Sequence, residues 1–174
     1  MVITPRDYQF DMISKIRLKI SNGTKHILAQ LSTGGGKTVI FSYIAQNATK
    51  KGKRVLIITD RDELLNQAGG SIKNFNLNPQ YIKAGTKHID RRRDIFIAMS
   101  QTLRNRIGRQ EWDNWILNEI DIVIIDECHG QEFNYLFEST LLANKIVLGF
   151  TATPERKGKM RQLGLDYEIM LKGS

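Results

Sequence analysis

The feature that most constrains the fold is a set of short, almost uninterrupted apolar runs rich in β-branched residues. Val55–Ile58 and Ile122–Ile125 are the longest of these runs. Runs without polar alternation are typical of parallel strands that are covered on both faces. We predict strands at His26–Leu31, Val55–Thr59, Gln80–Lys83, Ile95–Met99, Ile122–Asp126 and Ile146–Phe150.

Longer polar–apolar patterns between these runs indicate helices. Pro5 suits a first helical turn, and the pattern continues to about Ile20. Further helices are predicted at Lys37–Lys51, Asp62–Phe75, Thr102–Ile107, Gln110–Asn118 and Phe133–Leu142. Gly69 and Gly70 each cost roughly 1 kcal/mol inside a helix, so we expect that helix to end early. Strands alternating with helices predict an α/β three-layer sandwich around a mostly parallel sheet.

A glycine-rich loop lies between the first predicted strand and the following helix. It reads Leu31-Ser32-Thr33-Gly34-Gly35-Gly36-Lys37-Thr38. Glycines let backbone N–H groups turn toward phosphate oxygens, and the helix N-terminus adds a positive dipole end. Lys37 would reach the β- and γ-phosphates, and Thr38 would hold Mg²⁺. The strict pattern has glycine in place of Leu31, so a plain turn is the alternative, but the strand–loop–helix context favours a nucleotide site.

The run Ile122–Ile125 ends in two adjacent carboxylates, Asp126 and Glu127. Asp126 can hold Mg²⁺ through water, and Glu127 can orient and deprotonate an attacking water. A solvated acidic pair would be the better interpretation if no phosphate loop preceded it. Cys128 and His129 lack the partners of a zinc site. We interpret Cys128 as a small buried filler, and His129 as a relay from the nucleotide to Thr151 and Thr153.

The charge balance favours a polyanionic partner. The 174 residues suit one domain, and the net charge is +8 with a pI of about 9.7. A basic surface that serves solubility explains the charge equally well.

The single cysteine rules out an internal disulfide and fits a reducing compartment. We see neither a signal peptide nor the roughly 20 apolar residues of a membrane span, and we expect a cytoplasmic protein.

In this order, the motifs resemble those of the superfamily 2 DExH-box helicases and translocases. The matching segments, which cover nearly the whole chain, are Arg6-Asp7-Tyr8-Gln9 (Q motif), the phosphate loop, Thr59–Gln67 (motif Ia), Ile97–Leu103 (the next nucleic-acid contact motif), Asp126–His129 (motif II) and Thr151-Ala152-Thr153-Pro154 (motif III). Several are weak when taken singly. The missing first glycine of the loop is itself a feature of this superfamily.

The resemblance implies a RecA-like P-loop domain that binds ATP and Mg²⁺. It implies that Gln9 reads the adenine edge, and that Arg6 belongs to the same nucleotide site. It also implies coupling through Thr151 and Thr153. The nucleic-acid contacts it implies are Arg61, Gln101, Thr102 and Arg104, with Arg106 as a further candidate. Asp60 stands where the family often has proline, which predicts a less rigid loop before Arg61.

The resemblance further implies a second RecA-like domain that supplies arginine fingers. We expect residues 1–174 to be the first motor domain alone and to be monomeric. We interpret Gly173-Ser174 as residues left by the truncation of a longer protein. Nucleotide binding with slow hydrolysis is predicted, because an arginine finger contributes on the order of 10³–10⁵ in rate. Weak, salt-sensitive nucleic-acid affinity is also expected.

The leading hypothesis is a DNA helicase or translocase domain that acts in recombination, repair or restriction, similar to phage branch-migration helicases and restriction motors. Such a protein would act at the nucleoid, or in the host cytoplasm if phage-encoded. Two alternatives stay open: a stand-alone nucleotide switch, and a basic nucleic-acid-binding module without catalysis.

Basic clusters occur at Lys50-Lys51-Lys53-Arg54, Arg91-Arg92-Arg93, Arg104/Arg106/Arg109 and Arg156-Lys157-Lys159-Arg161. Each cluster alone is most simply a solvated face. For Trp112 and Trp115, packing is the default and base stacking the alternative.

Overall fold

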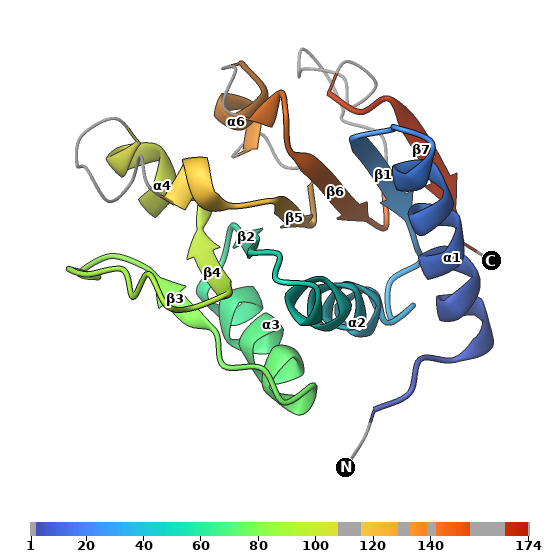
Figure 1. Ribbon diagram of the computed structural model, residues 1–174, viewed down its shortest axis with the longest axis horizontal. Helices are drawn as coiled ribbons and strands as arrows, with labels where there is room; N and C mark the ends of the chain where they lie inside the picture. The colour runs from blue at the N-terminus through green and yellow to red at the C-terminus, as the bar shows by residue number, and fades with distance from the viewer. Residues whose placement is uncertain (1–2, 108–115, 129–132, 139–141, 154–165, 174) are drawn as a thin grey trace.

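The computed structural model describes residues 3–107, 116–128, 133–138, 142–153 and 166–173. Its centre is a seven-stranded sheet in the order β3-β4-β2-β5-β6-β1-β7 (Figure 1). All of its strand pairs are parallel. The strands are β1 His26–Gln30, β2 Val55–Thr59, β3 Gln80–Ile82, β4 Ile95–Met99, β5 Ile122–Asp126, β6 Ile146–Thr151 and β7 Ile169–Lys172. The α/β prediction is confirmed, and the sheet is entirely rather than mostly parallel.

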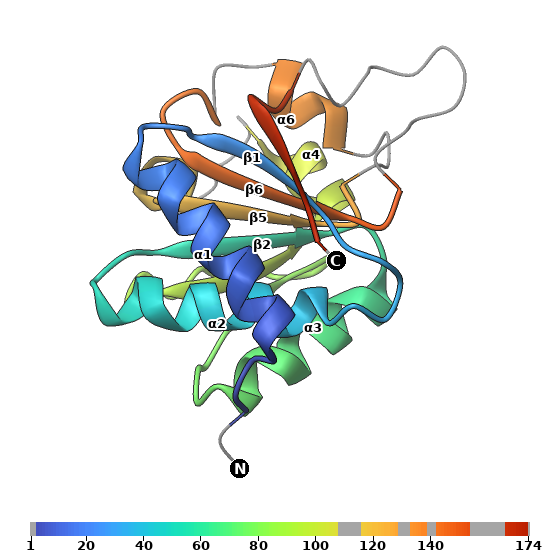
Figure 2. The same ribbon diagram turned by 90° about the vertical axis from the view of Figure 1, so that its right-hand side faces the viewer.

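Helices cover both faces of the sheet and complete three layers (Figure 2). One face carries α1 (Asp7–Ser21), α2 (Lys37–Lys50) and α3 (Asp62–Asn74). The other carries α4 (Ser100–Arg106), α6 (Asn134–Glu138) and the helical residues 116–119. No helix in these described parts of the chain is long and apolar enough to cross a bilayer.

The apolar runs are continuous because each strand buries both of its faces. In β2, Ile57 packs into the core under α1, α2 and α3, whereas Ile58 packs into the core under α4 and α6. In β5, Ile124 and Ile125 divide in the same way. All four side chains are fully buried. The interpretation of these runs as strands covered on both faces is therefore confirmed.

Two helix predictions were wrong in detail. Pro5 precedes the first helix, which begins at Asp7, because Gln9 Oε1 accepts a hydrogen bond from Arg6 N at 2.8 Å and places the helix start there. The glycine pair does not shorten α3, which runs on to Asn74. A side chain at position 69 would meet the Tyr81 ring, so Gly69 allows close packing of that ring at the helix. Nothing lies within 4 Å of the corresponding point at Gly70.

Other differences concern the ends of elements. The fourth helix begins at Ser100 rather than Thr102. Within the predicted helix Phe133–Leu142, the described residues form α6, with 3₁₀-helical residues at 133 and 142. Strand β7 was not predicted; it pairs with β1 at the sheet edge. Several predictions lie outside the described residues: most of Gln110–Asn118, Arg109, Trp112, Trp115, His129, Pro154 and the cluster from Arg156 to Arg161.

Candidate nucleotide and nucleic-acid site

The predicted motifs meet at one edge of the sheet, because parallel strands all end on the same side (Figure 2). The phosphate loop follows β1, and the two acids stand at the end of β5. Strand β6 pairs with both β1 and β5, so the loop and the acids flank the end of β6. Ligands of open α/β sheets bind at this carboxyl edge.

Hydrogen bonds from neighbouring segments hold the end of β6. Leu31 N donates to Thr151 O at 3.0 Å, and Cys128 N donates to Phe150 O at 3.0 Å. The phosphate loop and the acidic box are therefore both fixed to the same short stretch of backbone. Cys128 is 1% exposed, which agrees with its interpretation as a buried filler.

The phosphate loop has a backbone that its glycines make possible. Gly34 has a φ of 81°, and Gly36, the N-cap residue of α2, has a φ of 71°. Gly35 N donates to Ser32 O at 2.9 Å and closes the loop. A Cβ at position 36 would overlap the Gln9 amide, so this position needs glycine for space as well as for conformation. The loop offers a cradle of backbone in front of the N-terminus of a 14-residue helix.

Lys37 forms an ion pair and hydrogen bond with Glu127 Oε1. The two side chains are 12% and 27% exposed, so the pair sits partly out of water. Glu127 has a φ of 50°, a left-handed backbone conformation that costs on the order of 1 kcal/mol or more for a residue with a side chain. The backbone at this residue points its carboxylate at the phosphate loop.

Asp126 is buried beside this pair, with 4% of its surface exposed. The pKa of Asp126 is raised to about 6, first by burial and then by the charge of Glu127, while the charge of Lys37 acts to lower it. Asp60, which follows β2, also acts to raise this pKa. A buried carboxylate that shares its surroundings with two other acids favours a cation beside it. The donors therefore suit the hard, oxygen-preferring Mg²⁺ ion.

Gln9 lies beneath the phosphate loop and is 4% exposed. Its Nε2 donates to Gly36 O at 3.5 Å, and its Oε1 accepts from Arg6 N. Its amide thus joins the start of α1 to the loop in this structure. Contact with an adenine edge remains a prediction, as does the assignment of Arg6 to the nucleotide site.

Thr151 is fully buried and closes a tight turn after β6. Its hydroxyl donates to Thr153 O at 2.9 Å and accepts from Thr153 N at 3.1 Å. Thr153 itself is exposed at the end of this turn. The structure thus brings both threonines to the carboxyl edge, whereas His129 lies outside the described residues.

Two of the predicted nucleic-acid residues line a hollow between α3 and α4. This hollow has a volume of about 760 Å³, and Gln101 and Thr102 line it. A smaller cavity of about 250 Å³ is lined by Asp60, Ser100, Gln101 and Arg104. The Arg61 side chain at the start of α3 is 75% exposed. The Arg106 guanidinium donates to Thr86 O at 2.5 Å.

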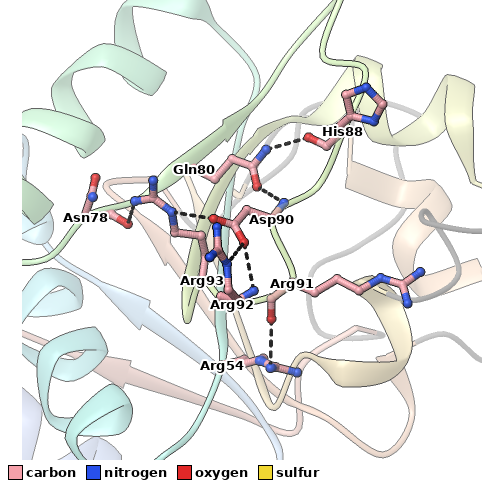
Figure 3. A network of polar contacts seen from close by, with 8 residues as sticks. All are labelled: Arg54, Asn78, Gln80, His88, Asp90, Arg91, Arg92 and Arg93. Atoms are coloured by element: carbon pink, nitrogen blue, oxygen red, sulfur yellow. Dashed lines mark hydrogen bonds and ion pairs between the residues drawn. The ribbon is translucent and has the colours of Figure 1, made fainter.

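Two basic clusters lie at the opposite, amino edge of the sheet, where β2 and β4 begin. Asp90 accepts hydrogen bonds from Arg92 N and Nε at 3.1 Å each and from Arg93 Nε at 3.4 Å (Figure 3). These bonds, those from Arg92 first, hold the pKa of Asp90 below its usual value. Arg54 donates to Arg91 O at 3.1 Å and to Glu119 Oε2 at 3.1 Å. This network fastens the β3–β4 connection to the start of β2, away from the acidic box.

Some residues of the site had no recognised role in the sequence. Asp60 drew notice only as a departure from a family pattern, and its place beside Asp126 depends on the pairing of β2 with β5. Tyr135 of α6 donates to Ser100 O at 2.9 Å, a contact across 35 positions. Local sequence carries no signal for such a long-range contact.

The fold and the carboxyl edge together define a RecA-like P-loop domain of the superfamily 2 helicase kind. Residues 2–156 match the ResIII family, the type III restriction enzyme res subunit, and the chain belongs to this family. The chain is 36% identical, over 170 residues and 88% of its length, to a putative ATP-dependent helicase, IRC3, of Saccharomyces cerevisiae. It spans 24% of that relative.

Solved structures show the same fold at lower identity. The UvsW helicase from bacteriophage T4 superposes with a TM-score of 0.74 at 20% identity, covering 98% of this chain and 60% of that one. The SWI2/SNF2 ATPase core of Sulfolobus solfataricus, solved in complex with dsDNA, has a TM-score of 0.68 at 21% identity, covering 88% of this chain and 33% of that one. The RecA-like fold and the helicase-type motor domain predicted from sequence are confirmed.

Proposed function

We propose that this chain is the ATP-binding first motor domain of a DNA helicase or translocase that hydrolyses ATP with Mg²⁺ to move along or remodel DNA. The observation that carries the proposal is the ion pair between Lys37 and Glu127 beside the buried carboxyl of Asp126. In this proposal Lys37 is the phosphate-binding cation, Asp126 the metal ligand and Glu127 the general base, and the closeness of the three side chains supports these roles.

Nucleotide binding begins with an exchange at Lys37. The ammonium leaves Glu127 for the β- and γ-phosphate oxygens, while backbone N–H groups of residues 33–38 face the remaining oxygens. Thr38 and Asp126 would hold Mg²⁺, partly through water. When bound there, the ion would supply positive charge that neutralises the phosphates and makes the γ-phosphorus more electrophilic.

Glu127 is freed by the same exchange. Its carboxylate then orients a water molecule and accepts a proton from it as the water oxygen bonds to the γ-phosphorus. The bond from that phosphorus to the β–γ bridging oxygen breaks at the same time, and ADP leaves with the electron pair. His129, Thr151 and Thr153 relay the change in nucleotide state to the rest of the motor. The hydrogen-bonded turn between the two threonines lies directly beyond the strand that touches both the loop and the acidic box. This shared strand is the route we propose for coupling.

DNA binds along the part of the carboxyl edge formed by the starts of α3 and α4. Arg61 and Arg104 contact phosphates, and Gln101 and Thr102 line the hollow between the two helices. The structural neighbour from Sulfolobus solfataricus, solved in complex with dsDNA, favours DNA over RNA. A second RecA-like domain completes the site with arginine side chains. The isolated domain is monomeric, and the complete protein works in the cytoplasm, at the nucleoid or in an infected host.

Stimulation of ATP hydrolysis by different nucleic acids tests this proposal. The complete protein should be assayed with Mg²⁺ and with duplex DNA, branched DNA or single-stranded RNA of matched length and charge. Duplex or branched DNA should raise kcat, and Arg104→Gln should raise the DNA concentration needed for half-maximal stimulation. Stimulation by single-stranded RNA with no response to either DNA would contradict the assignment to DNA. Unchanged nucleotide binding in Lys37→Ala would contradict the nucleotide site.

A further inference from the structure

Helix α4 carries three of the four proposed nucleic-acid residues on only 7 residues. A helix this short is marginal by itself in water, because too few hydrogen bonds offset the cost of nucleation. Its conformation and orientation must therefore come from contacts with the surrounding structure. Two polar side-chain contacts, one at each end of α4, meet this requirement.

The first contact comes from Tyr135 of α6. Its hydroxyl donates to Ser100 O at 2.9 Å and lies 3.4 Å from Ser100 Oγ, at the first residue of α4. Ser100 is 1% exposed, so the contact is shielded from water. Burial raises the pKa of Tyr135 to about 12, and the hydroxyl remains a donor throughout the range of ordinary assays.

The second contact comes from Arg106, the last residue of α4. Its Nη1 donates to Thr86 O at 2.5 Å, in the turn of residues 83–86 that follows β3. This turn is well defined: Thr86 N donates to Lys83 O at 3.0 Å, and Lys83 N donates to Thr86 Oγ1 at 3.1 Å. Gly85 has a φ of 88°, which suits the third position of such a turn. The arginine thus ties the end of α4 to a fixed point at the sheet edge.

We propose that Tyr135 and Arg106 are positioning residues that hold α4 in its binding geometry and thereby set the affinity for nucleic acid without touching it. The inference rests on the proposed role of α4 in nucleic-acid binding. A binding surface that is ordered before its ligand arrives avoids the entropic cost of ordering upon binding. Loss of either contact should loosen α4 while Arg104, Gln101 and Thr102 remain present.

Tyr135→Phe tests the first contact, because it removes one hydroxyl and keeps the buried ring. The matched control is Tyr43→Phe on α2, on the other face of the sheet, where the ring packs edge-on against Phe10 and Phe75. Hydrogen exchange of the backbone amides of residues 104–107 is measured without nucleic acid. It should become roughly three- to tenfold faster in Tyr135→Phe, the effect of one hydrogen bond, and remain unchanged in Tyr43→Phe.

DNA affinity, measured by fluorescence anisotropy, should weaken by a similar factor in Tyr135→Phe, with unchanged affinity for a labelled ATP analogue. Exchange at residues 104–107 that matches wild type would overturn the proposal, whatever the DNA affinity. A wild-type chain that binds neither DNA nor RNA would instead contradict the proposed function, since the exchange measurement does not depend on a ligand.

Arg106→Gln separates a positioning role from a direct phosphate contact. A direct contact contributes about one unit to the slope of log K against log salt, as we expect for Arg104→Gln. Arg106→Gln should weaken DNA binding and speed exchange at residues 104–107, while the slope stays at its wild-type value. A slope reduced as much as in Arg104→Gln, or unchanged exchange, would overturn the role assigned to Arg106.

Discussion

Lys37 and Glu127 form an ion pair, and a nucleotide whose phosphates bind Lys37 would separate them. Glu127→Gln keeps the shape of the side chain and removes its charge. We expect a labelled ATP analogue to bind several-fold more tightly to this variant, because Lys37 no longer leaves an ionic partner. Hydrolysis by the complete protein should fall by about 10²–10⁴, the contribution of a general base.

Glu119→Gln is the matched control for this variant. Glu119 pairs with Arg54 at the amino edge of the sheet, at an N–O distance of 3.1 Å. Its loss should change neither nucleotide affinity nor hydrolysis. Wild-type hydrolysis by Glu127→Gln would show that the proton goes to another group.

Asp126 makes the metal-free protein less stable at neutral pH. Its pKa of about 6 in the folded protein lies above the ordinary value of 3.8 for an exposed aspartate, so the folded state binds more protons than the unfolded state between these pH values. The free energy of unfolding therefore falls as pH rises through this window. The contribution of Asp126 to stability is smallest above about pH 6. Asp126→Asn should stabilise the protein at pH 7.5, in EDTA and without nucleotide, by on the order of 1–3 kcal/mol.

Urea denaturation at two pH values checks this prediction. Below about pH 3 the carboxyl is protonated in both states, so the stability gained by Asp126→Asn should disappear there. An equal gain at both pH values would contradict the electrostatic explanation and point instead to a packing difference.

At the level of residues, the sequence predicts those contacts that follow from neighbours in the chain. The Lys37 loop and the Asp126–Glu127 pair each stand directly after an apolar strand, and strand order then brings them together. The hydrogen bond between Tyr135 and Ser100 joins positions with no shared local pattern. The hydrogen bond from Arg106 to Thr86 O was not predictable either, because a sequence shows the charge of Arg106 and not the carbonyl that accepts its hydrogen bond.

The two adjacent glycines of α3, Gly69 and Gly70, have different surroundings, although the sequence alone does not distinguish them. A Cβ at Gly69 would lie 2.6 Å from Cζ and 2.8 Å from Cε1 of Tyr81, whereas Gly70 has nothing within 4 Å. Gly69→Ala should therefore destabilise the protein by about 1–3 kcal/mol through overpacking. Gly70→Ala should stabilise it by about 0.5–1 kcal/mol, because alanine is the better helix former.

Urea unfolding of the two variants under the same conditions measures both effects. Opposite signs at neighbouring positions of one helix would confirm that Tyr81 packing, rather than helix propensity, requires Gly69. Equal stabilisation by the two substitutions would show that the Tyr81 ring moves away at little cost.

At the level of elements, the strands with continuous apolar runs were predictable and the edge strand was not. Val55–Thr59 and Ile122–Asp126 agree residue for residue, because burial on both faces demands an uninterrupted apolar sequence. Strand β7 lies at the sheet edge, where Met170 is 41% exposed and the burial alternates. Partial exposure weakens the apolar pattern that identifies a strand.

Across the whole molecule, the basic residues separate into two edges with different roles. Arg104 lies at the carboxyl edge beside the proposed DNA track, whereas Arg92 lies at the amino edge, with 91% of its side chain exposed and paired with Asp90. Arg104→Gln should weaken DNA binding and lower its salt slope by about one. Arg92→Gln, an equal change in net charge, should leave both nearly unchanged.

Anisotropy titrations over a series of salt concentrations measure this difference. Equal losses in the two variants would show that DNA binding follows net charge rather than the geometry of the carboxyl edge. That outcome would favour a general basic nucleic-acid-binding surface over a motor track.

The central claim concerns nucleotide binding at the carboxyl edge, and Lys37→Ala tests it most directly. The affinity for a labelled ATP analogue is measured by equilibrium titration with and without Mg²⁺, and Lys53→Ala at the amino edge is the control. Lys37→Ala should weaken binding by about tenfold or more, as expected for a charge-assisted hydrogen bond, and Mg²⁺ should strengthen binding to wild type. Equal affinities for wild type, Lys37→Ala and Lys53→Ala would contradict the account.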